Sequence, residues 1–498
     1  MVERYWEALK GVKDPEIPVL NIVEMGMVLG VEAEGKRVKV RFRPTFSGCP
    51  AIQLIREEIV GALKEAGADF LLLEASLRLG GKVRTARQEG FLVEGGPDAS
   101  VRYKKEVLEL AQAVGLEPIG TLPEKPAAYI LYRGKRHPLP EGLLQVVPGD
   151  LKALARTPLL SLPGKLRALY DLFLPRGAKE DETLREFVER RLGPEVYRAL
   201  VAPLAGGVYG GEPDDLSMRA AFPQLWELEG RHRSLLLGAM RVRKGRGSRE
   251  GGSLFFSFAE GLQALTRRMA EALGERVLRG TPVLGLEPAR GRWRLHTPKG
   301  ALLAEAVVLA IPAPQAAGLL RPFLPEATAL LKGIPHTPAA TVSLAFPGAL
   351  PVEGHGLLVA KGEGLRARGF TWTHRTWPGR VPEGFSLVRA YFSGEAARLS
   401  EEALIRLALE DLARLLPGLP RVHRAWAFRF PEGMPAYRVG HLDRVERLEM
   451  ALVKAPGLFL AGNYLQGVGL PEVVRSGRRA AQRALAHLSL GEAHGASR

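Results

Sequence analysis

The apolar positions of the chain follow two different periods, and each period predicts a different kind of strand. Residues 38–42 alternate apolar and charged side chains, which is typical of a strand with one buried face. Residues 306–311 and 458–461 are instead continuous apolar runs, which are typical of strands covered on both faces, and residues 70–73 are predicted as a further strand. The sequence therefore predicts an α/β part with buried strands.

Two longer regions have other patterns. Residues 104–240 repeat their apolar side chains mostly at the helical spacing, whereas residues 335–440 alternate strands with turns. We expect a helical domain followed by a mostly antiparallel sheet that roofs a pocket. The helical pieces are 106–114, 165–173, 181–200 and, further on, 258–273; the strands are 341–346, 355–360, 370–374 and 386–392.

The stretch GLFLAGNYLQGVGLPEVVRSGRRAA, residues 457–481, combines a buried strand, a glycine-rich turn and a helix start. Pro471 fits the first turn of a helix, where no backbone donor is lost, and basic residues lie towards the helix end. Backbone amides that converge at a helix start can bind phosphate or an electron-rich ring edge. An ordinary strand, turn and helix without a ligand predicts the same spacing.

The residues of this stretch resemble the C-terminal flavin motif of the protoporphyrinogen and coproporphyrinogen oxidase family, in the FAD-dependent amine-oxidase-like superfamily. The likeness extends over residues 61–498. It implies an FAD cofactor whose flavin end lies beside the helix start. By this resemblance the cofactor contacts of the stretch are Gly462, Asn463, Val468, Gly469 and Leu470.

The likeness begins with residues 61–67, which resemble the end of the first helix of a Rossmann-type unit, and Glu74 closes the next strand. A carboxylate there can accept hydrogen bonds from ribose hydroxyls, although a solvated glutamate is the simpler interpretation. Gly80 and Gly81 let the backbone approach a cofactor. The resemblance adds further cofactor contacts: Ala75, Ser76, Arg78, Lys82, Gly96, Pro97 and a strand residue, Val283, in 281–283.

The chain lacks the family's opening strand and GxGxxG turn, whose glycines let helix amides reach the pyrophosphate. A strand at 37–43, a turn at 47–50 and a helix at 51–66 have the right order to fill that position. Side chains in the turn would occupy the space of the pyrophosphate, so we expect weak FAD binding. A gene fusion, a deletion or an assembly artefact explains the same join. Counting back from Glu74, the residues at the glycine positions are Ala51, Gln53 and Arg56.

Residues 1–60 resemble the PaaD-type family linked to iron–sulfur assembly, in DPEIPVLNIVEMGMV and FRPTFSGCPA. In that family the cysteine of SGCP handles a metal or cluster, which implies such a role for Cys49. A thiol at a helix start can be activated by the helix dipole. Cys49 is the only cysteine, so the chain can form neither a four-thiolate cluster nor an intrachain disulfide. An inert, partly buried cysteine is the alternative, and we expect no other metal ligand.

The resemblance also implies the reaction: a porphyrinogen loses six electrons in steps, to the flavin and then to dioxygen. Gly356, Leu358 and Tyr391 would face the tetrapyrrole, unless they are plain sheet packing. Arg102 is the candidate partner for the propionates, unless it is a surface arginine. No side chain stands out as an acid or base, and the catalytic residues stay unassigned, because the cofactor carries the chemistry.

The chain of 498 residues has a formal charge of +16, which suits an anionic partner. Nucleic acid is the weakest candidate, since the densest basic run, residues 241–249, has no interleaved aromatic residues. A carboxylate-bearing substrate or a peripheral membrane contact explains the charge better. The charged start is unlike a signal peptide, so we expect a cytoplasmic protein, with peripheral contact to the inner membrane face as an extension. The candidate membrane face is Leu159, Leu160, Leu162, Leu166, Leu169, Tyr170 and Phe173, with Lys165 and Arg167 alongside.

Together the patterns predict an α/β plus α+β fold with a Rossmann-like FAD domain, a mixed-sheet substrate domain, a helical domain and an N-terminal α+β PaaD-like segment. The expected function is oxygen-dependent oxidation of protoporphyrinogen IX or coproporphyrinogen III through FAD, in haem biosynthesis. The alternatives are another FAD oxidoreductase, acting on amines or polyenes, and a non-catalytic porphyrin-binding or iron–sulfur assembly fusion protein. The expected boundaries are 1–60 for the PaaD-like segment, 61–103, 255–330 and 441–498 for the FAD domain, 104–254 for the helical domain and 331–440 for the substrate domain.

Overall fold

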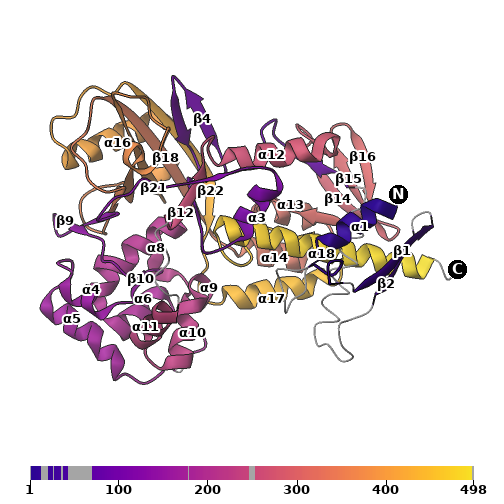
Figure 1. Cartoon of the computed structure of the whole chain (residues 1–498), viewed down its shortest axis with the longest axis horizontal. Coiled ribbons are helices and arrows are strands. Elements are labelled where there is room, and N and C mark those ends of the chain that lie inside the picture. Colours follow the sequence, from indigo (N-terminus) through magenta and orange to yellow (C-terminus); the bar gives the residue numbers. More distant parts are fainter. Residues whose placement is uncertain are drawn as a thin grey trace.

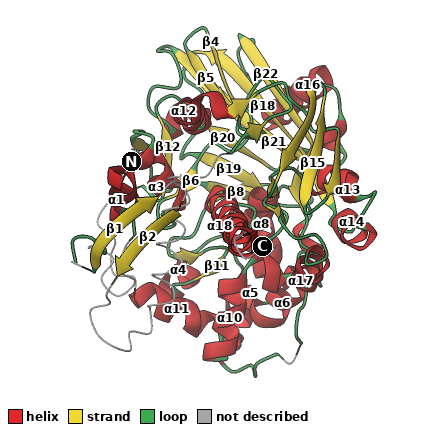
Figure 2. Cartoon of the chain, turned by 90° about the vertical axis from the view of Figure 1, so that its right-hand side faces the viewer, coloured by secondary structure: helices red, strands yellow, loops and turns green. Residues whose placement is uncertain are grey.

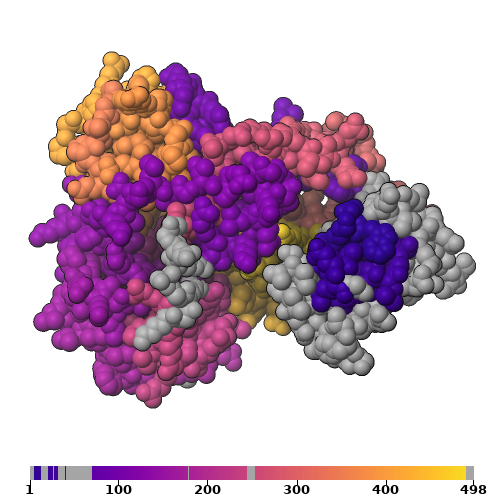
Figure 3. All heavy atoms as spheres, in the orientation of Figure 1, coloured from indigo at the N-terminus to yellow at the C-terminus, as the bar shows by residue number. Residues whose placement is uncertain are grey.

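The computed structural model describes residues 2–12, 21–25, 27–34, 37–42, 70–177, 179–245 and 253–495. A large sheet and a layer of helices lie at one end of the molecule, and a small N-terminal unit lies at the other (Figure 1). The space-filling view shows the same separation, with the indigo N-terminal unit far from the orange part of the sheet (Figure 3). In the ranges given, no helix combines the length and apolarity that a membrane span requires.

The largest sheet has seven strands. In order they are β22 (Arg424–Pro435), β18 (His336–Pro347), β21 (Phe385–Ser393), β20 (Gly369–Trp372), β19 (Gly356–Val359), β8 (Tyr129–Tyr132) and β9 (Lys135–Pro138). All neighbours are antiparallel except β19 and β8. One face is apolar and packs against α16 (Glu401–Leu415), where Val342, Leu344 and Phe346 are fully buried. The sequence predicted β18 to β21 and missed β8, β9 and β22.

A layer of helices packs below this sheet in Figure 1. The predicted helix 181–200 is interrupted at Gly193, whose φ of 90° few other residues adopt. The capping box of Thr183 and Glu186 starts α6. The helices are α4 (Leu151–Arg156), α5 (Leu162–Leu169), α6 (Leu184–Leu192), α7 (Pro194–Val196), α8 (Ala202–Tyr209), α9 (Met218–Ala221), α10 (Pro223–His232) and α11 (Leu235–Gly245).

A buried ion pair holds this helical layer together. Asp171 and Arg191 are both 0% exposed, and the arginine Nε contacts the carboxylate Oδ1. The other carboxylate oxygen accepts from the Ser234 hydroxyl at 2.6 Å and from the Leu236 amide at 2.9 Å. Arg191 also donates to the Pro175 carbonyl at 2.8 Å. Every group of the pair is therefore satisfied, which a buried charge requires.

Two separate pairs of parallel strands lie where the Rossmann-like sheet was predicted. β3 (Leu72–Leu73) pairs with β13 (Val277–Leu278), and β17 (Val307–Leu309) pairs with β23 (Leu458–Leu460). No strand of the described chain joins the two pairs. The run 70–73 was predicted as the second strand of the Rossmann-type unit; β3 covers its last two residues, and its first three side chains are 39% to 53% exposed. The reason is that β3 has a strand neighbour on one side alone among the described residues.

Helices and an antiparallel meander cover the two strand pairs. Helix α18 (Leu470–Gly495) begins one residue before the predicted start. The predicted strand 281–283 is wrong, because these residues form the loop after β13. The predicted helix 258–273 begins only at Gln263, after a turn. The remaining covering elements are α12 (Gln263–Leu273), α13 (Ala313–Leu320), α14 (Pro325–Lys332), α17 (His441–Leu452), β14 (Gly285–Ala289), β15 (Arg292–Thr297) and β16 (Gly300–Ala304).

Short elements connect these parts, and several are strands in a region predicted to be mostly helical. β12 (Phe255–Phe258) lies between β6 (Ser100–Val101) and β7 (Pro118–Gly120). The others are β4 (Thr85–Gln88), β5 (Phe91–Glu94), α3 (Glu106–Ala113), β10 (Leu143–Leu144) and β11 (Val147–Pro148). β12 pairs with β6 and β7 from far along the chain, so the local sequence pattern does not reveal these three strands, whereas β4 with β5 and β10 with β11 are local hairpins.

The N-terminal unit has a small core of its own, formed by Leu9, Val12, Ile22, Met27 and Val28. Its elements are α1 (Val2–Lys10), β1 (Val28–Glu34) and β2 (Arg37–Phe42). β2 pairs with β1 in an antiparallel hairpin that lies apart from the other strands (Figure 2). The strand predicted at 37–43 therefore does not fill the position between the two parallel pairs. Its alternating pattern suits a hairpin with one covered face, and a central parallel strand is buried on both.

Removal of the Asp171 carboxylate should strongly destabilise the helical layer. We expect Asp171→Ala to lower the free energy of unfolding by about 3–5 kcal/mol, because the Arg191 guanidinium stays buried without its counter-charge. Urea unfolding followed by circular dichroism measures the change. Arg231→Ala is the control, since its pair with Glu227 is exposed and should contribute at most about 1 kcal/mol. Equal losses in the two variants would contradict the assignment.

Candidate functional site

The two parallel strand pairs pack against a common apolar core, and loops follow the carboxyl ends of their strands. Leu73 of β3 and Val283 of the loop after β13 pack against the core that contains Leu458 and Leu460 of β23. The crevice outside the carboxyl ends of parallel strands is the usual ligand site of such sheets. Three loops meet there: residues 74–83, 94–98 and 461–470.

Glu74 follows β3 directly, as the sequence predicted. Its amide donates to the Leu278 carbonyl at 2.9 Å, and its carbonyl accepts from the Thr281 amide at 2.9 Å. Its carboxylate Oε1 accepts from the Ser76 amide and hydroxyl at 2.8 and 2.9 Å. Oε2 receives no hydrogen bond from the described residues, so one lone-pair face is available for a ligand hydroxyl.

The loop 75–82 is stiffened by its own arginine. The Arg78 guanidinium donates to the carbonyls of Leu79, Gly81 and Val83 at 3.1, 2.6 and 3.0 Å. Gly80 has φ of 103°, and a Cβ on it would lie 2.8 Å from the Val83 carbonyl oxygen. Arg78 therefore shapes the loop through backbone carbonyls. Ala75 and Ser76 are exposed beside Glu74.

Lys82 links this loop to the large sheet. Its Nζ donates to the Gly433 carbonyl on β22 at 2.6 Å, and burial lowers the pKa of the ammonium group. A Cβ on Gly96 would lie 1.8 Å from the Lys82 carbonyl oxygen, so only glycine fits between the two loops. The 94–98 turn, which includes Pro97, thus lies directly against the 74–83 loop.

The loop after β23 is held from both sides. The Gly462 amide donates to the Ser476 hydroxyl of α18 at 3.0 Å, and the Tyr437 hydroxyl donates to the Asn463 carbonyl. A Cβ on Gly467 or Gly469 would lie within 2.1 to 2.6 Å of the Glu472 side chain. Close packing therefore explains both glycines. Val468 packs against the core of the helical layer, and Leu470 starts α18.

A second apolar core connects the two cofactor loops. Val83, at the end of the 74–83 loop, packs against the same cluster as Leu470 and Val474 of α18. Lys104 pairs with Glu472 at 2.5 Å in the first turn of that helix. A carboxylate in this turn complements the positive end of the helix. The sequence analysis missed Lys104, because nothing local connects it with a residue so far along the chain.

The inner face of the large sheet carries the predicted substrate residues. Leu358 is half-buried and packs against the helical layer, and the Tyr391 hydroxyl lies 2.9 Å from the Thr371 hydroxyl. Desolvation raises the pKa of Tyr391 to about 12. Gly356 has a packing reason for its identity, since a Cβ would lie 2.3 Å from the Phe370 carbonyl oxygen on β20.

Arg102 lies elsewhere, on the β6 side of the 94–98 turn. Its guanidinium is stacked 5.6 Å from the ring centroid of Phe256, and its amide donates to Leu254. No described contact joins it to Tyr391 or Leu358. The structure therefore brings together the cofactor candidates, Leu358 and Tyr391, but not Arg102.

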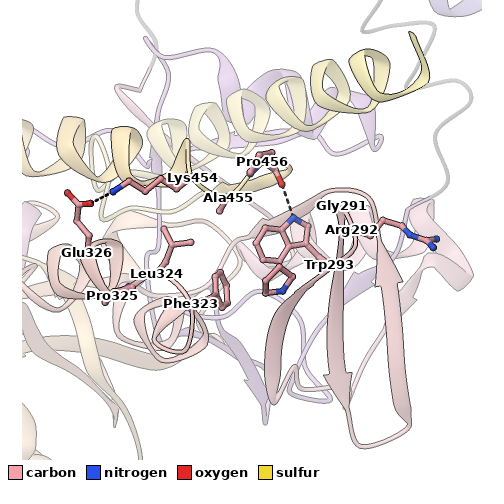
Figure 4. Close-up of a pocket in the computed structure, with 11 residues that line it drawn as sticks. Gly291, Arg292, Trp293, Phe323, Leu324, Pro325, Glu326, Lys454, Ala455 and Pro456 are labelled. Atoms are coloured by element: carbon pink, nitrogen blue, oxygen red, sulfur yellow. Dashed lines mark hydrogen bonds and ion pairs between the residues drawn. The ribbon is translucent and has the colours of Figure 1, made fainter. Parts of the chain in front are cut away.

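Two cavities lie near these elements. One, of about 620 Å³, opens where the helical layer meets the sheet, next to the residues that follow Leu358. Its cationic lining residues are Lys361, Arg366, Arg368 and Arg438, and its anionic ones are Glu212, Asp215 and Glu395, so the lining has one more cation than anions. The other, of about 320 Å³, is lined by residues of β15 and α14 and by the segment 454–456 that precedes β23 (Figure 4). There Trp293 donates to the Pro456 carbonyl at 3.0 Å, and Lys454 pairs with Glu326 at 2.9 Å.

Cys49, Ala51, Gln53 and Arg56 lie outside the described residues, as does the predicted helix 51–66. Within the described part of the chain, no three His, Cys, Asp or Glu side chains are grouped as a metal site would need. The expectation that side chains occupy the space of the pyrophosphate and weaken FAD binding stays a prediction from the sequence.

The profile of a family described as flavin containing amine oxidoreductase matches residues 61–485. The chain belongs to this family. A coproporphyrinogen III oxidase of Bacillus subtilis (strain 168) is 34% identical over 472 residues, which are 92% of this chain and 99% of the relative. A chloroplastic protoporphyrinogen oxidase 1 of Spinacia oleracea is 31% identical, and the match covers 84% of this chain and 80% of the relative. The predicted fold class and flavin cofactor are thereby confirmed.

Solved structures show the same architecture. A structure from Exiguobacterium sp. 255-15, named for protoporphyrinogen oxidase, matches with a TM-score of 0.74 and 32% identity over 87% of this chain and 97% of that one. A cyclohexylamine oxidase of Brevibacterium oxydans IH-35A matches with a TM-score of 0.60 at 18% identity, which shows a shared fold. Residues 3–69 match a second family, described as iron–sulfur cluster assembly protein. The two-part resemblance is thus confirmed.

The described residues of this flavoenzyme fit a flavin dinucleotide at both of its ends. Glu74 offers a free carboxylate oxygen beside a strand end, as a ribose requires. The loops around Gly96 and Gly469 bring backbone to the start of α18, where amide donors can meet a polar ring edge.

Loss of the Glu74 carboxylate should weaken FAD binding. We expect Glu74→Ala to cost about 1–3 kcal/mol, or about 5- to 150-fold in Kd, through lost charge-assisted hydrogen bonds. Titration of the purified chain with FAD, followed by flavin fluorescence, measures it. Glu287→Ala, at an exposed glutamate of β14, is the control. An unchanged Kd for Glu74→Ala would refute the ribose assignment.

Proposed function

We propose that the chain oxidises a porphyrinogen, coproporphyrinogen III or protoporphyrinogen IX, to the porphyrin in haem biosynthesis. The observation that carries this proposal is the 34% and 31% identity, over most of the chain, to oxidases named for these two substrates. When bound, FAD supplies the hydride acceptor, and dioxygen takes the electrons from it.

We assign the chain's own residues to binding and orientation. Glu74 holds the ribose. One wall of the proposed cofactor site consists of Ala75, Ser76, Arg78, Gly80, Gly81 and Lys82. A second wall consists of Gly96, Pro97 and Val283. Gly462, Asn463, Val468, Gly469 and Leu470 present the start of α18 to the ring. Leu358 and Tyr391 support this proposal from the sheet, since both face away from the α16 core.

The substrate would lie between the inner sheet face and the helical layer, beside Leu358, with Gly356 and Tyr391 on the same sheet. A cleft of about 620 Å³ opens at this interface, lined by the residues that follow Leu358 and not by Leu358 itself, and its volume lies within the usual range for small-molecule sites. Its small cationic excess suits a substrate with several carboxylates. Arg102 stays our proposed partner for one propionate.

Separate apolar cores support the four domains proposed from the sequence. Residues 144–239, in 104–254, supply most of one core, and residues 340–416, in 331–440, supply most of another. A third core joins 286–331 to 448–464 within the FAD domain, and the N-terminal unit has its own. This packing supports the proposed grouping of 255–330 with 441–498, whereas a further core joins residues 107–116 to 256–265 across the proposed boundary at residue 254.

The function is tested with the purified chain, added FAD and each porphyrinogen, by following porphyrin fluorescence. We expect porphyrin to form, and FAD to titrate with a Kd several powers of ten weaker than for an intact relative, because a few phosphate contacts of about 1.5–3 kcal/mol each are missing. The Bacillus subtilis oxidase is the matched control. No porphyrin at saturating FAD would refute the proposed function, and stoichiometric yellow flavin would refute the expectation of weak binding.

A non-catalytic iron–sulfur assembly fusion is the second candidate, and the match of residues 3–69 with its separate core favours it. The same experiment separates the two. A chain that binds neither FAD nor porphyrinogen, yet binds ferrous iron stoichiometrically through Cys49, would support the second candidate.

We also propose peripheral contact with the inner membrane face, from a narrower surface than the sequence suggested. Leu159 and Leu160 are buried, and Leu169 packs against the helical core. Arg167 donates to three backbone carbonyls of α6, so its guanidinium is already used in contacts within the protein. The exposed apolar side chains that remain are Leu162, Leu166, Tyr170 and Phe173, at 55% to 73% exposure along α5 and the following turn.

Replacement of Leu166 and Phe173 by serine should release the chain from membranes. Each large apolar side chain contributes about 1.5–3 kcal/mol when buried, so the double variant should bind at least tenfold more weakly. Sedimentation with vesicles of phosphatidylglycerol and phosphatidylethanolamine measures the bound fraction. Met450→Ser with Val453→Ser, at two exposed apolar positions beside α17, is the control. Equal binding by both double variants would contradict the proposed face.

A further inference from the structure

The 94–98 turn carries two acidic side chains beneath the large sheet, and two buried arginines face them. Glu94 and Arg380 are 3% and 1% exposed, and their nearest charged atoms are 3.5 Å apart. Asp98 lies 3.3 Å from Nη1 of Arg389, which is 3% exposed. The four groups form two facing ion pairs, and burial raises the pKa of Glu94. Such a cluster is tolerable in the interior only because the charges balance.

Arg389 has a second set of contacts, with the backbone of the turn. Its Nη2 donates to the Gly96 carbonyl and, at 3.3 Å, to the Gly95 carbonyl. Its guanidinium also lies 4.8 Å from the ring centroid of Tyr391, one of the proposed substrate residues. The Gly95 carbonyl receives a further bond from the Thr341 hydroxyl at 2.7 Å. β18 and β21 therefore hold the turn through the Thr341 hydroxyl and through both terminal nitrogens of one guanidinium, Nη2 at the two carbonyls and Nη1 beside Asp98.

The cluster is not fully satisfied. Nε of Arg389 and Nε of Arg380 are buried and make no hydrogen bond to any described residue, and Nη1 of Arg389 faces Asp98 without a hydrogen bond. An unsatisfied buried donor is unfavourable, and it calls for an explanation beyond stability. The position of the turn provides one. Gly96 packs so closely against the Lys82 carbonyl that the turn cannot move towards the 74–83 loop without displacing it.

We propose that Arg389 is a positioning residue that fixes the 94–98 turn between the substrate face of the sheet and the cofactor loops. It couples the two surfaces, because one guanidinium contacts Tyr391, Asp98 and the carbonyls of the turn. The inference deepens the proposed function, on which its link to the substrate rests. A lysine would keep the charge but lose the fork, so geometry rather than charge carries the role.

The test compares Arg389→Lys with wild type and with Arg429→Lys, a matched change at an exposed arginine on β22. Hydrogen exchange is measured over residues 91–100 in the full chain without ligand. We expect exchange in this segment to become at least tenfold faster in Arg389→Lys alone, while the urea midpoint stays near that of wild type. FAD titration should show a Kd raised about tenfold, with a changed visible circular dichroism of the bound flavin.

Exchange that is equally fast in the turn and throughout the sheet would overturn the proposal, because it would indicate a merely structural arginine. Unchanged exchange in the turn would overturn it as well. If Arg389→Lys does not fold, Thr341→Val takes its place. This variant removes the other side-chain hydrogen bond to the Gly95 carbonyl and should speed exchange in the same segment. Porphyrinogen takes no part in these measurements, so failure of the proposed reaction would leave their result decisive.

Discussion

The candidate site depends on the packing of two parallel strand pairs that share no hydrogen bond in the described part of the chain. Leu73 of β3 packs against the same apolar core that contains Leu458 and Leu460 of β23. Apolar packing is not directional, so it fixes the relative position of the pairs less strictly than a strand ladder does. The short contacts of Gly96 and of the Gly467–Gly469 segment add the precision that the core lacks.

Apolar side chains in and near the two parallel strand pairs stay exposed. Leu71 precedes β3, Leu77 lies in the loop after it, and Val308 belongs to β17; they are 53%, 80% and 38% exposed. Exposed apolar area forgoes about 25 cal/mol per Å² relative to burial. The proposed ribose end of the site therefore lies beside apolar side chains that are not fully buried.

The sequence predicted those elements whose pattern is local. The strand at 458–461, the helix that follows it and four strands of the large sheet were found with errors of a few residues. β8 and β9 were missed, because they join the sheet through a parallel pairing with β19 that is more than 200 residues away in the chain. The exposure of 70–73 was missed because an apolar run shows only that a strand can be buried. Arg389 was missed because a single arginine in an alternating strand has no distinguishing local signal, although its inward-facing register could have identified it.

Two buried charge clusters among the described residues differ in how completely their hydrogen bonds are satisfied. Asp171 and Arg191 satisfy every donor and acceptor within the helical layer, so their pairing is explained by stability alone. Nε of Arg380 and Nε of Arg389 are buried without a hydrogen-bond partner among the described residues. Replacement of a buried ion pair by well-packed apolar residues is often neutral or stabilising, so an incompletely satisfied pair needs another reason. The reason consistent with the geometry is position: an apolar side chain cannot bond the Gly95 and Gly96 carbonyls and face Asp98, whereas the two terminal nitrogens of Arg389 do.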